Sequence, residues 1–499
     1  MKFTTALILP LSLFAELVSS QIYPASVYTT GFNSSFTFTP SQIEAAQLDD
    51  GLVDSIQNVI NFDRSQLAFG GPWEDEFYTL PPLVNDTGPL KPGQLLKVQA
   101  FTDPTAYAIP ADTALSRIMY TTTNFNGTVV PTSGFILWPY APKKLRNYGS
   151  AGHEQKSTTP RKAPVVLWAH GTSGFFRSQS PSSHRGLWYA HQAPFALVQA
   201  GYAVFAPDYA GLGISTSWDG SPIPHQYHAS PTTAHDALYG MRAAVEAFPT
   251  KLDNNFVVMG HSQGGGVAWA VAEALASEEA EFVDLVAGYK GSIAASPTTD
   301  VFSGPNGFIL PTVAVMLHSI FPSFQLSDWL TPLGVARTKL VKEVEGSIGV
   351  FQQLYLTSND IYKPNYRDTW YVDAFSKLAD AGRKDFKGPL LVLQGTKDAY
   401  VSYNTTSKSV EDTWDLYPDN DLEFLVASGV GHVPVLDATR HIWLQWIEDR
   451  LGGKPLAKKG NVRTDLESFM PIEQYLSTVN ALPLWAGLPN YSYLVPLSV

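Results

Sequence analysis

The sequence predicts an α/β protein with a mostly parallel central sheet, helices on both faces of that sheet and an inserted helical cap. From residue 164 onward, short continuous apolar segments alternate with helical segments, a pattern typical of parallel strands buried on both sides. A long stretch without strand patterns interrupts this alternation and predicts the cap. A glycine-flanked serine also stands where one predicted strand gives way to a helix.

Composition excludes several classes of protein. The chain has 499 residues, a net charge of −12 and no cysteine. The missing cysteine excludes disulfides, thiolate zinc sites, iron–sulfur clusters and a cysteine nucleophile. The negative charge argues against nucleic-acid binding, which needs excess Lys and Arg. No segment after the N-terminus reaches the ~18 apolar residues of a membrane span, so we expect no integral membrane segment.

The N-terminus predicts secretion. Lys2 precedes an apolar run, and small residues stand just before Gln21, so residues 1–20 are expected to be a signal peptide cleaved after Ser20. The alternative is a buried N-terminal helix. Secretion is compatible with five predicted N-glycan sites, each in an N-x-S/T sequence: Asn33, Asn85, Asn126, Asn404 and Asn490.

The elements follow in order along the chain. Residues 21–110 form an N-terminal extension, with a helix that Ser41 is expected to cap and a Pro-rich arm. Asn126-Gly127 predicts the turn of a hairpin between alternating strands at 118–122 and 133–137. The core covers 111–297 and 387–455, the cap 298–386 and a C-terminal tail 456–499. We expect strands at 165–168, 202–206, 256–259, 285–286, 390–393 and 422–426, and helices at 195–200, 230–248, 267–275 and 435–451.

Ser262 is the predicted nucleophile. It is the serine of a G-x-S-x-G sequence at residues 260–264, between the strand at 256–259 and the helix that follows. Such a sharp turn, allowed by small flanking residues, holds the hydroxyl above the sheet with a helix N-terminus beneath it. The alternative is a glycine-rich turn with a capping serine.

Asp398 and His432 are the predicted acid and base. A serine hydroxyl needs a base within hydrogen-bond reach, and in this architecture the order is serine, acid, histidine, each after a strand. Asp398 follows the strand at 390–393, and His432 follows the strand at 422–426. Rival residues fit less well: Asp437 and His441 lie in the last helix, and Asp208 is expected to brace a loop near the site.

Two backbone amides are expected to bind the oxyanion that forms during acyl transfer. The first belongs to Gln263, directly after the serine. The second is assigned to Thr172, in the loop at 170–174 after the strand at 165–168; the alternative is an ordinary strand-to-helix turn.

With these residues, the chain resembles the secretory-lipase family of α/β-hydrolases found in fungi and bacteria. The resemblance covers residues 77–453 and rests on five blocks in order: LWAHGT at 167–172, APDYAGLG at 206–213, GHSQGG at 260–265, VLQGTKD at 392–398 and GH at 431–432. It implies an α/β-hydrolase fold, a helical cap over the acyl pocket, and a Ser–Asp–His triad that falls on Ser262, Asp398 and His432. The chain departs from the family pattern in lacking a cysteine soon after the His-Gly loop and in its segment 218–233.

The predicted function is that of a secreted serine hydrolase acting on small-molecule or lipid carboxylic esters (an esterase or lipase) through an acyl-enzyme, with no metal or organic cofactor. Three alternatives remain. The same triad could serve a peptidase or amidase, or an acyltransferase. The chain could also be a catalytically silent binding module on a hydrolase scaffold.

Overall fold

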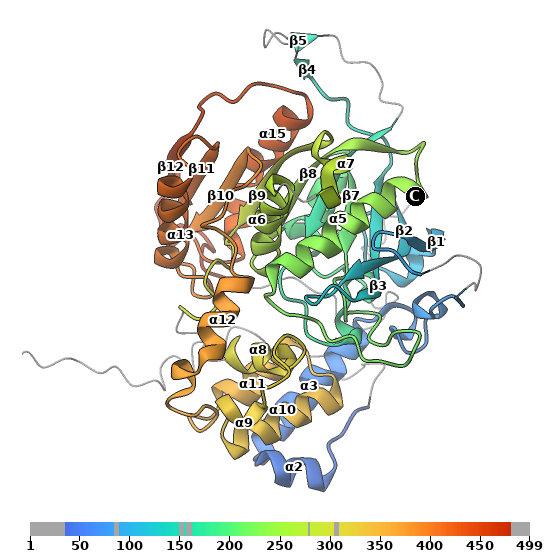
Figure 1. Ribbon diagram of the computed structural model, residues 1–499, viewed down its shortest axis with the longest axis vertical. Coiled ribbons are helices and arrows are strands. Elements are labelled where there is room, and N and C mark those ends of the chain that lie inside the picture. The colour runs from blue at the N-terminus through green and yellow to red at the C-terminus, as the bar shows by residue number, and fades with distance from the viewer. Residues whose placement is uncertain are drawn as a thin grey trace, which may run out of the picture.

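One ten-stranded sheet organises the chain. The computed structural model describes residues 35–83, 89–148, 154–155, 162–277, 280–303 and 309–480. The order in the sheet is β1-β2-β3-β7-β6-β8-β9-β10-β11-β12 (Figure 1). The pairs from β1 to β7 are antiparallel and the later pairs are parallel, so the predicted mostly parallel sheet is confirmed. The strands are β1 (Leu95–Thr102), β2 (Thr113–Thr123), β3 (Val129–Pro139), β6 (Ala163–Ala169), β7 (Ala203–Pro207), β8 (Leu252–His261), β9 (Tyr289–Ala295), β10 (Leu390–Gly395), β11 (Leu422–Ala427) and β12 (Asn461–Leu466); β4 (Asn147–Tyr148) and β5 (Glu154–Gln155) form a separate pair.

Helices cover both faces of this sheet, because successive strand residues point to opposite sides. Along β6, Val165 and Leu167 belong to the apolar cluster that includes α5 and α6. Val166 and Trp168 belong to the cluster of the opposite face, with α4, α14 and α15. The helices are α2 (Pro40–Ala46), α3 (Asp50–Ser65), α4 (Pro194–Gln199), α5 (Ser230–Ala247), α6 (Gln263–Ala276), α7 (Val283–Val286), α8 (Ile309–Leu317), α9 (Leu326–Trp329), α10 (Pro332–Val344), α11 (Ile348–Leu356), α12 (Trp370–Ala379), α13 (Tyr403–Leu416), α14 (Pro434–Ala438) and α15 (Arg440–Leu451).

A helical layer with its own core lies beside the sheet. Helices α8–α12 fill the chain between β9 and β10, and no strand occurs in the part of that segment that the structure describes, 298–303 and 309–386. The N-terminal helices α2 and α3 pack against this cap in the lower part of Figure 1 and share its apolar cluster. The Arg337 guanidinium in α10 strengthens this contact, because its Nε donates to the Ala46 carbonyl at the end of α2 (3.1 Å).

The predicted hairpin is confirmed, and three local predictions need correction. In the hairpin, Gly127 takes a φ of 82° in the turn between β2 and β3. The helix predicted to start at Ser41 is capped by Thr39, whose side chain accepts from the Gln42 amide. The helix expected at 435–451 is two helices, α14 and α15.

The third correction moves a strand. The apolar pair at 285–286 belongs to the short helix α7, and the strand is β9, from 289 to 295. This strand contains small residues such as Gly291, Ala294 and Ala295, so it lacks the bulky apolar pattern typical of a buried strand. The structure requires a small residue at Gly291, because a Cβ there would lie 2.7 Å from the Pro389 carbonyl oxygen and 2.7 Å from a ring carbon of Trp446.

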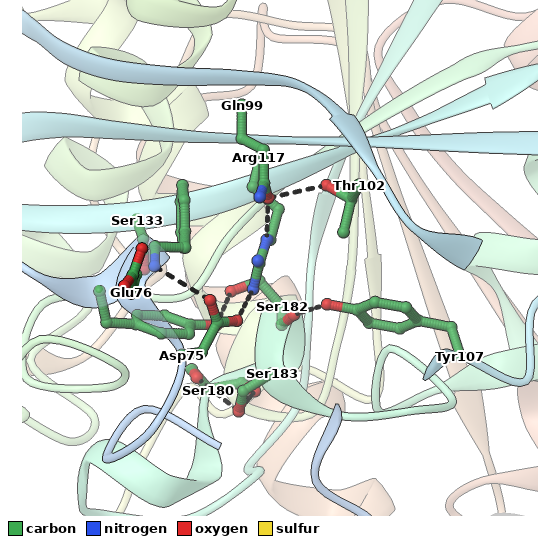
Figure 2. Close-up of polar contacts among 12 residues, drawn as sticks. Asp75, Glu76, Gln99, Thr102, Tyr107, Arg117, Ser133, Ser180, Ser182 and Ser183 are labelled. Atoms are coloured by element: carbon green, nitrogen blue, oxygen red, sulfur yellow. Dashed lines mark hydrogen bonds and ion pairs between the residues drawn. The ribbon is translucent and has the colours of Figure 1, made fainter. Parts of the chain in front are cut away.

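A buried ion pair joins the N-terminal arm to the sheet (Figure 2). Arg117 of β2 donates from one terminal nitrogen to Asp75 Oδ2 (2.6 Å) and from Nε to Gln99 Oε1 (2.7 Å). The Arg117 side chain is 1% exposed and that of Asp75 9%. Nearby, the Tyr107 hydroxyl donates to the Ser182 carbonyl (2.8 Å), a separate bond that joins the chain before β2 to the chain that follows β6.

Candidate active site

Ser262 stands at the sharp turn between β8 and α6. Its φ of 59° and ψ of −121° are unfavourable for a residue with a side chain. The turn is possible because its flanks are glycines: a Cβ on Gly260 would lie 1.9 Å from the Gly264 carbonyl oxygen, and a Cβ on Gly264 would lie 1.9 Å from the Ala169 carbonyl oxygen. The half-buried serine is therefore held at the N-terminus of α6, at the carboxyl edge of the sheet.

Asp398 follows β10 and is fixed on both carboxylate oxygens. Oδ1 accepts from the amides of Tyr400 (2.9 Å) and Val401 (2.8 Å). Oδ2 accepts from Gln394 Nε2 (3.1 Å) and from His432 Nδ1 (2.8 Å). Burial works against the charged carboxylate, but the adjacent His432 and these hydrogen bonds outweigh it and hold the pKa of Asp398 below its ordinary value of 3.8.

His432 follows β11 and meets Asp398 through a single ring nitrogen. Because Nδ1 donates to the carboxylate, Nε2 of the neutral ring carries the free lone pair, which is the tautomer that a general base needs. The side chain is 8% exposed. The three predicted residues thus follow the carboxyl ends of β8, β10 and β11, with β9 between β8 and β10 in the sheet.

His261, the residue before the serine, ties the two loops together. Its ring centre lies 4.5 Å from that of His432, and its Nε2 donates to the His432 carbonyl oxygen (2.9 Å). Its Nδ1 accepts from the Tyr189 hydroxyl (2.6 Å). Burial lowers the pKa of His261 to about 3, which keeps this ring neutral. We found no sequence signal for this link between His261 and the His432 backbone, since the partners are far apart in the chain.

The C-terminal segment also holds the histidine loop. The Gly431 amide donates to the Ser477 carbonyl (2.6 Å), and the Val433 amide donates to Asn480 Oδ1 (3.1 Å). Upstream of Ser477 in the chain, the same segment adds β12 to the sheet, parallel to β11. The stretch that the sequence predicted only as a tail therefore positions both neighbours of His432.

The loop that carries Thr172 lies against the serine turn. A Cβ on Gly171 would lie 3.0 Å from the His261 carbonyl oxygen, and a Cβ on Gly264 would lie 2.6 Å from that of His170. Within the described part of the chain, the amides of Thr172 and Gln263 donate no hydrogen bond to another protein atom. Neither amide is therefore committed to another group among the residues that the structure describes.

The rival residues lie elsewhere. Asp437 pairs with Arg440 near the surface, and His441 is exposed. Asp208 is buried, where Oδ1 accepts from the Ser182 amide (2.7 Å) and Oδ2 from the Ser133 hydroxyl (2.6 Å). It therefore braces the chain after β6, as expected, and Ser133 and Ser182 of this network are visible in Figure 2.

Neither a metal site nor a membrane span is found in the residues that the structure describes. Those residues hold no cluster of three or more His, Asp or Glu side chains suited to a metal ion. The helices among them are too short or too polar to cross a bilayer.

Known proteins share this architecture. A family model described as the alpha/beta hydrolase family matches residues 165–441, more than half of the chain. Lipase A of Candida antarctica superimposes with a TM-score of 0.59 at 16% identity, over 80% of this chain and 90% of that one. The esterase LipA of Xanthomonas oryzae, described as degrading rice cell walls, superimposes with a TM-score of 0.52 at 18% identity, over 73% of this chain and 100% of that one. No curated protein matches the sequence.

Proposed function

This chain belongs to the alpha/beta hydrolase family, and on that premise we propose that it is a serine hydrolase of carboxylic esters, of the esterase or lipase type. Ser262 is the nucleophile, His432 the general base and Asp398 the residue that orients the imidazole. The amides of Gln263 and Thr172 form the oxyanion site. The observation that carries the proposal is the 2.8 Å bond from His432 Nδ1 to Asp398, which leaves Nε2 as a base on a ring that lies 4.5 Å from the ring of His261, the residue before Ser262.

The reaction proceeds in two halves. Ser262 Oγ attacks the ester carbonyl carbon as its proton passes to His432 Nε2, and the two amides bind the resulting oxyanion. The carbon–oxygen bond to the alcohol then breaks, and the imidazolium protonates the leaving alcohol oxygen. Water next attacks the acyl-enzyme, losing its proton to His432. The imidazolium returns a proton to Ser262 Oγ as the acid is released. Asp398, whose pKa lies below its usual value, stays charged and stabilises the imidazolium.

Ester substrates are favoured by the structural neighbours, which are named as a lipase and an esterase. No specific observation in the structure favours a peptidase, an amidase or an acyltransferase. Matched ester and amide substrates, and product analysis with a competing alcohol, separate these activities from ester hydrolysis.

We also propose that the protein is secreted and glycosylated. Asn126, in the β2–β3 turn, and Asn404, in the first turn of α13, are both exposed, as glycan attachment requires. The predicted signal peptide at 1–20 and the sites Asn33, Asn85 and Asn490 lie outside the described residues. Mass spectrometry of the secreted protein would identify its first residue and its occupied sites.

The test of the proposed reaction is Ser262→Ala, assayed with a short-chain nitrophenyl ester. We expect turnover to fall by about 10⁶-fold, because nucleophile and base act as a unit, and labelling by a fluorophosphonate probe to disappear. Ser277→Ala, at the other end of α6, is the matched control and should retain both. Near-normal turnover by Ser262→Ala would overturn the assignment.

A further inference from the structure

The loop with Thr172 is positioned by residues from outside it. Residues 170–174 have no regular secondary structure, so side-chain contacts must fix their path. The Tyr209 hydroxyl donates to the His170 carbonyl oxygen (3.0 Å). The hydroxyl oxygens of Thr172 and Tyr227 lie 2.8 Å apart and share a hydrogen bond. Tyr227 comes from the segment 218–233, which the sequence analysis singled out and to which the proposed reaction gives no role.

Tyr227 is itself held rigidly. It is 2% exposed, and its ring lies edge-on to Phe175 at 4.8 Å between centres and 3.9 Å from the His228 ring. Phe175 in turn lies 4.2 Å from Phe351 of α11. The Tyr227 ring is therefore packed among aromatic side chains next to helix α11 of the cap, and this packing fixes the position of its hydroxyl.

The same segment contacts the other proposed oxyanion residue. His225 Nδ1 donates to the Ala210 carbonyl (3.2 Å), so its Nε2 is the acceptor for Gln263 Nε2 (3.0 Å). Burial lowers the pKa of His225 to about 3, which keeps this neutral tautomer in place. Two residues of one segment, His225 and Tyr227, thus bind the side chains of Gln263 and Thr172.

We propose that Tyr227 is a positioning residue for ester hydrolysis, which holds the Thr172 amide at the oxyanion through its hydrogen bond to the Thr172 hydroxyl. This inference rests on the proposed function. Thr172 is the more sensitive of the two donors, because it lies in an irregular loop while Gln263 begins a regular helix. An amide displaced by a fraction of an ångström in the transition state stabilises the oxyanion less, whereas ground-state binding of a small ester changes little.

The test is a double-mutant cycle of Tyr227→Phe and Thr172→Val, each of which removes one hydroxyl from the pair. We expect kcat for a short-chain ester to fall about 10-fold in each single variant, below the 10²–10³-fold cost of deleting a donor, with KM unchanged. The double variant should be no worse than either single variant, because both remove the same bond. The control is Tyr289→Phe, which loses a buried hydroxyl bond to Ser292 at the far end of β9 and should retain full kcat.

Each outcome decides one point. The positioning role would be overturned if Tyr227→Phe had the same kcat as the control Tyr289→Phe. It would also be overturned if the losses of the two single variants multiplied in the double variant. A fall in kcat confined to Tyr227→Phe, with Thr172→Val unaffected, would overturn it too. Should Tyr227→Phe fail to fold, Thr172→Val alone must show the loss of kcat at constant KM. The proposed function is tested separately by Ser262→Ala, and the outcome of that experiment does not depend on the role of Tyr227.

Discussion

Replacing Asp398 with Asn tests whether the carboxylate fixes the tautomer of His432. The amides of Tyr400 and Val401 both donate to Oδ1, so the asparagine oxygen must take that position and its NH₂ group must replace Oδ2. The NH₂ group then faces His432 Nδ1, which becomes an acceptor, and the ring proton moves to Nε2. It also faces Gln394 Nε2, another donor, whose second bond to the Val401 carbonyl (3.0 Å) opposes a flip.

With the proton on Nε2, His432 cannot accept the proton of Ser262, and we expect kcat to fall about 10⁴-fold, or roughly 5 kcal/mol of transition-state stabilisation. Steady-state hydrolysis of a nitrophenyl ester measures the fall, and circular dichroism establishes that the variant is folded. Asp437→Asn, the same change at the surface pair with Arg440, should keep full activity. A loss smaller than 10-fold in a folded Asp398→Asn variant would refute the tautomer argument.

Two further predictions concern stability. Asp75→Ala leaves the buried Arg117 charge unpaired, at a cost of about 3–5 kcal/mol. Since the unfolding entropy is about 1 kcal/mol per kelvin for 499 residues, calorimetry should show a Tm lower by about 3–5 °C, largely restored by adding Arg117→Met; an unchanged Tm would contradict this. Burial raises the pKa of Asp236 from 3.8 to about 7, so the native state binds the extra proton and its stability falls as pH rises from about 4 to 7, by about 1.4 kcal/mol per unit. Asp236→Asn should therefore flatten the dependence of Tm on pH over that range, and an unaltered slope would argue against a buried neutral carboxyl.

The sequence predicted individual turns well where the pattern that specifies them is local. The strand at 256–259 that runs into glycines and a helix predicts the turn at Ser262, because only that backbone geometry requires such small neighbours. The hairpin at Asn126-Gly127 follows from the same logic, since Gly127 adopts a positive φ. The strand β9 was misplaced because small residues such as Gly291 replace the bulky apolar residues typical of a strand. Gly291 is close to the Pro389 carbonyl oxygen and to Trp446, a constraint that a local sequence pattern does not show.

Sequence alone determined the residue types and their order: a serine, a carboxylate and a histidine, each after an apolar strand. This order is enough to predict that they lie at one edge of the sheet, because the carboxyl ends of parallel strands share that edge. Tertiary structure decided how firmly each is held. The Tyr189–His261 contact, the Asn480 bond beside His432 and the Tyr227 bond to Thr172 join segments that are 47 to 72 residues apart. Such hydrogen bonds carry no periodicity or spacing of their own, since they exist only once packing has brought the chain together.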